Sequence, residues 1–286
     1  MIRPARVRVV EVGPRDGLQN EAAALGVEDK VAFTQALIDA GLPVVEPGAF
    51  VSPRWVPQMA GSDEVLRRLR RPDGVRLPVL VPNRKGYEAA RAAGARDIAI
   101  FTAASETFNR KNVNASIDES FARFHEFVPD ALREGMWVRG YISTCFGCPY
   151  EGAVDPVRVV DVARRLADAG CHEISIGDTI GVANPDDVRR VVEAVATEVP
   201  LDRIALHLHD TQGMALANVE AGLELGVSVF DAAVGGTGGC PYAPGAPGNL
   251  ATEALVRLLE REGIEHGVDA DRLDHIAASL REVLAR

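Results

Sequence analysis

Two histidines near the end of a short apolar segment are the residues whose types and spacing most directly predict chemistry. His207 and His209 belong to Ile204–His209, a run of aliphatic residues that predicts a buried strand. Because side chains alternate along a strand, both imidazoles project from one face, with Leu206 and Leu208 on the other. Imidazole is the commonest metal-ligating side chain, so the pair predicts half of a metal site. Most histidines on strands bind no metal, so the prediction of a metal site depends on further ligands from the rest of the chain.

Asp16 and Asn249 are the groups expected to complete this metal site. One carboxylate, two imidazoles and an amide oxygen suit Mg²⁺ or Mn²⁺, whereas zinc favours three or four His or Cys ligands. Such a shell leaves positions for a chelating substrate, and a bound metal lowers the pKa of a hydroxyl group that it holds. Each residue also has a simpler interpretation, because Asp16 can cap the turn at Gly17 and Asn249 can be the N-cap of a helix over Leu250–Glu260.

Arg15 and Cys240 are the expected catalytic groups beside this shell. Arg15 adjoins Asp16, and a fixed cationic donor aimed at a developing enolate oxygen is worth about 3 kcal/mol. Cys240 lies in Ala232–Asn249, a glycine- and proline-rich loop of the length and composition typical of lids and binding loops. From such a loop a thiol could deliver or remove a proton at carbon, although Cys240 taken alone reads as a small loop residue.

The order of elements predicts the scaffold, which we expect to be a (β/α)8 TIM barrel with an additional C-terminal helix. Eight apolar runs, most followed by a helical pattern, read as parallel strands buried on both faces. A capping box at Ser116–Glu119 and a cap residue before proline at Asp155 and Asn184 mark helix starts. We expect one domain over residues 1–286, with Asp269–Arg286 as the extra helix. The eight runs are Val7–Val12, Val44–Glu46, Leu77–Val81, Asp97–Phe101, Trp137–Ile142, Glu173–Ile176, Ile204–His209 and Val227–Asp231.

A barrel places its chemistry in the loops that follow the strands, and the candidate residues meet this requirement. Asp210 and Thr211 are expected to open the helix after the seventh strand, and Gly226 falls where that helix should end. The remaining candidates follow strands in the same way: Arg15 and Asp16 after the first, Glu46 at the end of the second, Cys145 after the fifth, Asp178 and Thr179 after the sixth, and the loop with Cys240 and Asn249 after the eighth.

Composition bounds the possible partners and compartments. The 286 residues are 47% hydrophobic and 25% charged, with a net charge of −10, which is typical of a globular protein. No basic run stands out and no apolar run is long enough to span a bilayer, so we expect neither nucleic acid nor membrane as a partner. With four cysteines and no secretory signal pattern, we expect a reducing, cytoplasmic location. The CxxC pair of Cys145 and Cys148 has no second pair, which favours a structural or adventitious role over redox chemistry.

Six long segments resemble the 3-hydroxy-3-methylglutaryl-CoA lyase family, whose members are metal-dependent TIM-barrel lyases. The resemblance extends over nearly the whole chain, roughly from Val7 to Gly263, and the segments together are highly specific. The segments are VEVGPRDGLQNE (Val10–Glu21), FVSPRWVPQM (Phe50–Met59), GCPYEG (Gly147–Gly152), ISIGDTIGVANP (Ile174–Pro185), HLHDTQGMALAN (His207–Asn218) and GGTGGCPYAPGAPGNLATE (Gly235–Glu253).

The resemblance implies an acyl-CoA substrate, 3-hydroxy-3-methylglutaryl-CoA, which is cleaved to acetyl-CoA and acetoacetate, and it implies a homodimer. It assigns metal ligation to Asp16, His207, His209 and Asn249, enolate stabilisation to Arg15, and enolate protonation to Cys240. It also implies a catalytic role for Asp16, because the hydroxyl proton of the substrate is lost to Asp16 or through water. It implies that Gln19, Glu46, Asp178 and Thr179 surround the substrate. The basic pairs Arg84-Lys85 and Arg110-Lys111 are our own candidates for contacts with CoA phosphates, with a solvated surface as the alternative.

One departure from the family pattern leaves the acyl substrate open. Pro47-Gly48-Ala49 follows Glu46, where the family usually has small hydroxylated residues. A related 3-hydroxy-3-alkylglutaryl-CoA or another hydroxyacid is therefore an alternative substrate. A Claisen-condensing enzyme of the isopropylmalate-synthase type is a further alternative, but it would be expected to carry a C-terminal regulatory domain beyond Gly263. A non-enzymatic binding protein would be expected to have lost a ligand or Cys240, and none is lost.

Overall fold

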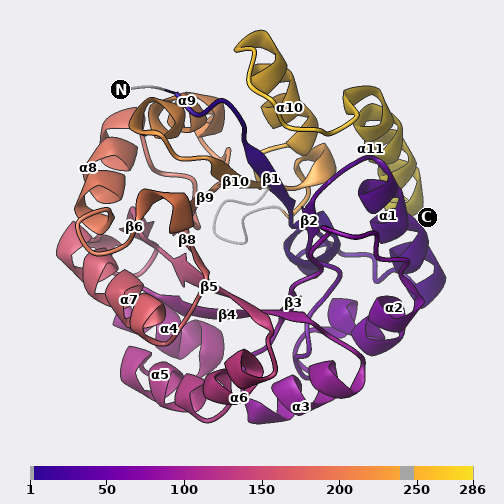
Figure 1. Cartoon of the computed structure of the whole chain (residues 1–286), viewed down its shortest axis with the longest axis horizontal. Coiled ribbons are helices and arrows are strands. Elements are labelled where there is room, and N and C mark those ends of the chain that lie inside the picture. The colour runs from indigo at the N-terminus through magenta and orange to yellow at the C-terminus, as the bar shows by residue number, and fades with distance from the viewer. Residues whose placement is uncertain (1–2, 239–247, 286) are drawn as a thin grey trace.

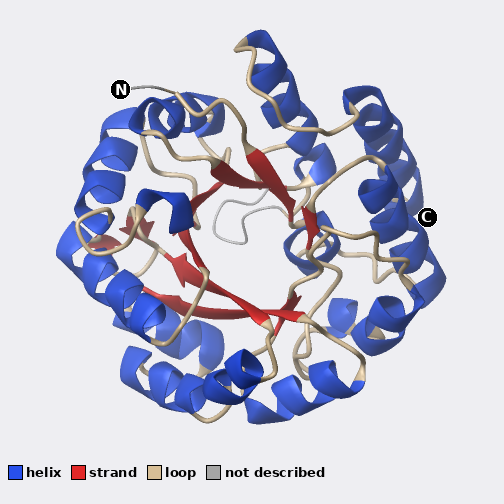
Figure 2. Ribbon diagram, viewed as in Figure 1, coloured by secondary structure: helices blue, strands red, loops and turns tan. Residues whose placement is uncertain are grey.

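The computed structural model describes residues 3–238 and 248–285. Within them, eight parallel strands form a ring of hydrogen-bonded neighbours in the order β2-β1-β10-β9-β8-β5-β4-β3, with helices outside the ring (Figures 1 and 2). The predicted TIM-type barrel is thereby confirmed. Its strands are β1 (Arg8–Glu11), β2 (Val44–Val45), β3 (Val79–Leu80), β4 (Asp97–Ala103), β5 (Trp137–Ser143), β8 (Glu173–Asp178), β9 (Ile204–Leu208) and β10 (Val229–Ala232).

The ring closes between its two shortest strands, β2 and β3. The N–H of Val45 donates to the carbonyl of Arg76 at 3.1 Å, and the N–H of Phe50 donates to the carbonyl of Leu80 at 2.8 Å. Parallel bridges at Val44↔Arg76 and Ala49↔Leu80 mark the same contact. The residues that flank β2 and β3 therefore complete the barrel, so all eight carboxyl ends lie at one end of the barrel.

The helices form the outer layer that buries the second face of each strand (Figure 2). The predicted C-terminal helix is present as α11, which packs against α1 (Figure 1). The α-helices are α1 (Val27–Asp39), α2 (Ser62–Arg68), α3 (Arg84–Ala92), α4 (Glu106–Val113), α5 (Ile117–His125), α6 (Val128–Arg133), α7 (Pro156–Asp168), α8 (Pro185–Val195), α9 (Ala215–Leu225), α10 (Thr252–Arg261) and α11 (Ala270–Leu284). Among the described helices, none is long and apolar enough to cross a membrane.

Local sequence signals account for several of these boundaries. Ser116 and Asn184 each begin a capping box, and Asp155 accepts a hydrogen bond from the N–H of Val157, as the sequence predicts. Helix α9 ends at Gly226, whose φ of 95° is accessible to glycine without a Cβ clash. These caps satisfy backbone groups at the helix ends and so define where each helix begins or stops.

Helix α9 lies unusually close to strand β9, which carries the histidine pair. A Cβ atom added at Gly222 would lie 2.7 Å from Leu206 Cδ1 and 3.1 Å from Phe230 Cε1. Glycine therefore lets the helix backbone pack against the leucine face of the strand. The opposite face of β9 points into the barrel, which is where His207 must lie.

Two expectations about local structure were wrong, and one element was missed. Asp210 and Thr211 do not open a helix, because α9 begins at Ala215, whose N–H donates to Asp210 Oδ1 at 2.9 Å. Asn249 is not a helix N-cap, since α10 begins at Thr252. The segment after β5 also contains a short antiparallel hairpin of β6 (Gly147–Cys148) and β7 (Gly152–Ala153), which the sequence analysis missed because two-residue strands leave no readable alternation.

Candidate metal centre

The candidate ligands come from the carboxyl ends of β1 and β9, which are separated around the ring by β10. β1 is followed by a single π-helical turn over Gly13–Gly17 that carries Asp16. In this turn the carbonyl of Val12 accepts from the N–H groups of Asp16 at 2.7 Å and Gly17 at 3.2 Å. Isolated π-helical turns recur at functional sites because they alter the direction of a few side chains. Here the turn directs Asp16 toward the strand β9 histidines.

Asp16, His207 and His209 form a group whose potential ligand atoms all lie within 4.8 Å of one another. The two Nε2 atoms of the histidines are 3.2 Å apart, and His207 Nε2 is 3.9 Å from Asp16 Oδ2. Both imidazoles are buried, whereas the Asp16 side chain retains 19% of its exposure. The group is therefore reached from solvent mainly past Asp16.

The donor set fits a divalent cation. Two imidazole nitrogens that face each other at 3.2 Å repel through their lone pairs unless a proton or a cation lies between them. The other ring nitrogen of His209, Nδ1, is buried without a hydrogen-bond partner in the described residues. A carboxylate beside two imidazoles is a donor set used for divalent metals, and its mixed oxygen and nitrogen character does not by itself identify which metal.

The charges within the group favour an ionised Asp16. Burial alone would raise the pKa of Asp16, but the charges of Arg15, His207 and His209 outweigh burial and hold it well below its usual range. Burial and the neighbouring His207 lower the pKa of His209 to about 4. An anionic oxygen and a neutral imidazole are the protonation states that metal ligation requires.

Asn249 reaches the group from the segment that precedes α10. His209 and Asn249 form an antiparallel bridge, and this pairing brings the amide beside Asp16. The nitrogen Nδ2 donates to Asp16 Oδ2 at 2.9 Å and to the carbonyl of Thr237 at 3.0 Å. Only the amide oxygen can bind a cation, so ligation by Asn249 stays a prediction that requires Oδ1 to face the metal.

Arg15 is held beside Asp16 by the carboxylate of Glu46. Its Nε lies 2.8 Å from Glu46 Oε2, its Nη1 lies 2.5 Å from Asp16 Oδ1, and the residue is 7% exposed. The second oxygen of Glu46 accepts from Tyr141 Oη at 2.5 Å. Both carboxylate oxygens of the fully buried Glu46 thus accept hydrogen bonds from the chain itself, so Glu46 orients Arg15, and its expected role in substrate binding stays a prediction.

Two of the remaining sequence candidates, Asp178 and Thr179, accept hydrogen bonds from the backbone at the same end of the barrel. Asp178 accepts from the N–H groups of Val182 and Ala183, each at 3.0 Å, and burial raises its pKa to about 6. Thr179 Oγ1 accepts from the N–H of Thr144 at 2.7 Å. Gln19 is half-buried just beyond the π-helical turn. Cys240 lies outside the described residues, and the substrate roles of the other three stay predictions.

The basic and cysteine pairs show different environments. Arg84 donates to the carbonyl of Glu126 and pairs with Asp130 at 2.7 Å, so its guanidinium is already bound within the chain. Lys111 Nζ lies 4.4 Å from the centre of the Tyr150 ring. Both thiols of the CxxC pair are buried, with Cys145 Sγ 3.1 Å from the carbonyl of Ile142 and Cys148 Sγ 3.0 Å from Ser105 Oγ. A phosphate contact by the basic residues stays a prediction.

Sequence reasoning missed a set of buried polar side chains inside the barrel. Arg139, Tyr141, Ser175 and Asp231 lie on barrel strands and are all buried. Arg139 Nη2 is 2.5 Å from Asp231 Oδ1, and Asp231 Oδ2 is 3.2 Å from His207 Nδ1. The sequence does contain an indication of this set, because a charged residue within an otherwise apolar strand needs a polar partner when both faces of the strand are buried.

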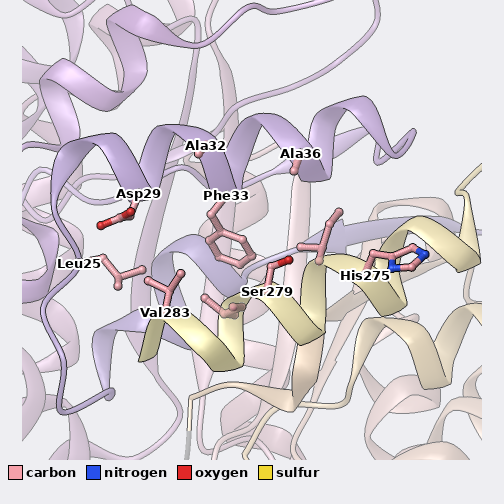
Figure 3. Close-up of a pocket in the computed structure, with 10 residues that line it drawn as sticks. Leu25, Asp29, Ala32, Phe33, Ala36, His275, Ser279 and Val283 are labelled. Carbon is pink, nitrogen blue, oxygen red and sulfur yellow. The ribbon is translucent and has the colours of Figure 1, made fainter. Parts of the chain in front are cut away.

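A surface pocket of about 260 Å³ lies on the outside of the barrel, between α1 and α11 (Figure 3). Its lining is mainly apolar, with Asp29, Ser279 and His275 as its polar members. None of the residues of the Asp16–His207–His209 group contributes to it. We therefore assign the chemistry to the carboxyl ends of the strands, where polar groups of suitable type converge, and not to this pocket.

Comparisons with known proteins agree on one family. A family model described as HMGL-like matches residues 6–280. The hydroxymethylglutaryl-CoA lyase of Pseudomonas mevalonii is 54% identical over 274 residues, which are 96% of this chain and 91% of that protein. The mitochondrial hydroxymethylglutaryl-CoA lyase of Bos taurus is 52% identical over 283 residues, covering 99% of this chain and 87% of that protein.

Solved structures give the same result. The crystal structure of hydroxymethylglutaryl-CoA lyase from Pseudomonas aeruginosa superposes with a TM-score of 0.97 and 50% identity, covering all of this chain and 95% of the other. An HMG-CoA lyase from Acinetobacter baumannii, solved in complex with coenzyme A and 3-methylmalate, superposes with a TM-score of 0.94 and 37% identity, covering 99% of this chain and 92% of the other.

Proposed function

The chain belongs to the HMGL-like family, and on this basis we infer that it is a hydroxymethylglutaryl-CoA lyase, which splits 3-hydroxy-3-methylglutaryl-CoA into acetyl-CoA and acetoacetate. The observation that carries this proposal is the convergence of Asp16, His207 and His209 in a chain about half identical to curated lyases over nearly its whole length. The enzyme is a carbon–carbon lyase, and the group of Asp16, His207 and His209 lies at the end of the barrel where TIM-barrel enzymes bind substrate.

We propose Mg²⁺ or Mn²⁺ as the cation, with Asn249 as a fourth ligand through its Oδ1 atom. Held by Asp16, His207 and His209, the cation would polarise a hydroxyl group of the substrate and lower its pKa. Asp16 is a weak base, because its neighbouring charges hold its pKa far below the usual value. Asp16 is therefore proposed chiefly as a ligand, and the hydroxyl proton is proposed to leave through water, with transfer to Asp16 as the alternative.

Arg15 is proposed to stabilise the negative charge that develops as the carbon–carbon bond breaks. The electron pair of that bond moves to the acetyl fragment, which becomes a thioester enolate, while the hydroxyl carbon becomes the ketone of acetoacetate. Arg15 is suited to the enolate oxygen because Glu46 and Asp16 hold its guanidinium in a fixed, largely water-excluded position. Cys240 is proposed to donate a proton to the enolate carbon, and this completes acetyl-CoA.

We further propose a CoA thioester as the substrate, a homodimer as the assembly, and the cytoplasm as the compartment. A related lyase has been solved with coenzyme A bound, which supports the first of these. The thiols of Cys145, Cys148 and Cys171 are free and buried in the described residues, as expected in a reducing compartment. Sedimentation of the purified protein tests the dimer, and a monomer at micromolar concentration would contradict it.

The proposed reaction is tested with purified protein, 3-hydroxy-3-methylglutaryl-CoA and either Mg²⁺ or Mn²⁺. Acetyl-CoA and acetoacetate should form in equal amounts, a chelator should stop the reaction, and added metal should restore it. Substitution Cys240→Ala should lower turnover without weakening metal binding; unchanged turnover would remove Cys240 from the mechanism. Failure to cleave this substrate or any 3-alkyl analogue would overturn the proposal.

A related 3-hydroxy-3-alkylglutaryl-CoA is the second candidate substrate, favoured by the segment Pro47-Gly48-Ala49. A Cβ atom added at Gly48 would lie 2.4 Å from Ser62 Oγ, and that hydroxyl accepts from the N–H of Ala49 at 3.2 Å. Gly48 is therefore packed closely against Ser62, and Pro47-Gly48-Ala49 carries no side-chain hydroxyl group. Comparing kcat/KM across a series of 3-alkyl substrates distinguishes the two candidates.

A further inference from the structure

A buried network of charged side chains lies directly behind the candidate metal centre. Asp231 on β10 pairs with His207 on β9 in the sheet register, and its Oδ2 lies 3.2 Å from His207 Nδ1. Arg139 on β5 contacts both oxygens of Asp231, with Nη2 2.5 Å from Oδ1 and Nη1 3.1 Å from Oδ2. Ser175 on β8 donates to Asp231 Oδ2 at 2.9 Å. Three strands besides β10 therefore converge on this one carboxylate.

The direction of each hydrogen bond follows from the groups involved. A guanidinium can only donate, so Asp231 accepts from Arg139 at both oxygens and is bound as a carboxylate. A carboxylate can only accept, so the proton between Asp231 and His207 belongs to His207 Nδ1. The neutral imidazole then has its lone pair on Nε2, the atom that faces Asp16 and His209.

We propose that Asp231 is a positioning residue that holds His207 in the Nδ1–H tautomer with Nε2 free to bind the cation, and that Arg139 and Ser175 hold Asp231 in place. The tautomer is a property of the chain alone, while its consequence for catalysis rests on the proposed lyase function. His209 provides a contrast within the same centre, because its Nδ1 is buried without a partner in the described residues. The His207 ring is thus held through its Nδ1 atom, whereas the His209 ring is not.

Substitution Asp231→Asn makes a specific prediction about the proton. The amide oxygen should turn toward Arg139 Nη2, whose only acceptor in the described residues is Asp231 Oδ1, because Arg139 Nη1 also donates to Tyr141 Oη and keeps that acceptor. The amide nitrogen then takes the place of Oδ2, where the Ser175 hydroxyl can rotate to accept from it and where it faces His207 Nδ1. Facing a donor, His207 Nδ1 must accept, so the ring proton moves to Nε2. A proton on Nε2 occupies the direction of the metal.

The first test is ¹⁵N NMR of the metal-free, histidine-labelled full chain at pH 9, with the His207 signals assigned by their loss in a His207→Gln variant. Wild type should show Nδ1 protonated, and Asp231→Asn should show Nε2 protonated. Wild type with the proton on Nε2 would overturn the proposal without any variant, so the test survives a variant that fails to fold. An Nδ1–H tautomer that persists in folded Asp231→Asn would also overturn it.

The second test is the affinity for Mn²⁺ alone, measured by calorimetry without substrate. Loss of an outer partner of a metal-ligating histidine typically costs about 10- to 100-fold in affinity, and Asp231→Asn should fall in this range. Asp97→Asn is the matched control, since Asp97 is a buried carboxylate bound by Arg71 and Arg76 at the start of β4. Equal loss in both variants, or no loss in Asp231→Asn, would contradict the positioning role.

These measurements separate the inference from the proposed function. If wild type binds Mn²⁺ and shows the Nδ1–H tautomer but cleaves no 3-hydroxy-3-alkylglutaryl-CoA, the proposed reaction fails while the role of Asp231 stands. If wild type cleaves the substrate but Asp231→Asn retains the tautomer and the affinity, the role of Asp231 fails while the reaction stands. Lower temperature should restore neither the tautomer nor the Mn²⁺ affinity of Asp231→Asn, because the substitution changes the direction of a hydrogen bond and not the stability of the fold.

Discussion

Glu46 Oε2 lies 2.8 Å from Arg15 Nε, and both side chains are buried at the carboxyl ends of neighbouring strands. The pair explains how one of the longest and most flexible side chains can be held in one position beside Asp16. Tyr141 binds the other oxygen of Glu46, so the carboxylate is fixed at both ends. Arg15 is thereby presented to the site without the loss of rotamer freedom that a free arginine would incur on binding.

Substitution Glu46→Gln should lower kcat about 10- to 100-fold, the equivalent of one or two charge-assisted hydrogen bonds. The amide oxygen can accept from Arg15 or from Tyr141 but not from both, and the amide lacks the negative charge that pairs with the guanidinium, so Arg15 is held less firmly. Metal affinity should change little, because Glu46 does not contact the metal group. Steady-state kinetics and calorimetry measure the two quantities. Glu119→Gln serves as the control, since glutamine preserves the capping box of α5.

Removal of a metal ligand should abolish cation binding while leaving the fold intact. His209→Ala should weaken Mn²⁺ binding by more than the roughly 100-fold upper range for an outer partner, because a ligand itself is lost. Its Nδ1 has no hydrogen-bond partner in the described residues, so little stability should be lost with it. His275→Ala is the matched control and should bind Mn²⁺ as wild type does, because His275 is an exposed residue beside the pocket outside the barrel. Retention of full affinity in His209→Ala would remove that residue from the centre.

Glu11 should make the stability of the fold depend on pH. Its Oε1 accepts from the N–H groups of Gly13 and Val234, and burial raises its pKa from 4.5 to about 7. The folded chain therefore binds the proton more tightly, and the stability that protonated Glu11 contributes is fully present below pH 4.5 and is lost as pH rises through about 7.

Glu11→Gln should remove this dependence, because the amide oxygen can accept the same two N–H groups and the nitrogen can donate to Thr252 Oγ1. As the pH rises from 5 to 8, the free energy of unfolding of the variant should increase relative to that of wild type by up to about 3 kcal/mol. Urea unfolding at the two pH values measures this difference. An equal difference in stability between variant and wild type at both pH values would show that the pKa of Glu11 is not raised.

Gly222→Ala should destabilise the fold by about 1–3 kcal/mol, although alanine favours helix by roughly 1 kcal/mol over glycine. The added methyl group would overlap Leu206 on the strand that carries the histidines. Leu206→Ala opens space for it, so the double variant should lose less stability than the sum of the single variants. Strict additivity in thermal or urea unfolding would show that the contact does not limit the approach of α9 to β9.

Much of the site could be predicted from the sequence, because the positions of its residues along the strands follow from short-range rules. Two residues apart on a buried strand, His207 and His209 must share a face, and Asp16 must lie just beyond the end of β1. The helix caps at Ser116 and Asn184 depend only on atoms within three residues along the chain. The closed barrel also follows from counting strand–helix units, each of which has a strong local pattern.

The tertiary structure alone decided which distant groups meet. That Asp231 lies beside His207, and that Arg139 reaches it across the barrel, depends on the register of every strand pair in the ring. The π-helical turn at Asp16 and the bridge from His209 to Asn249 likewise arise from contacts with neighbouring segments. Local periodicity specifies the face of a strand on which a side chain lies, whereas the side chain it meets is determined only when the barrel closes.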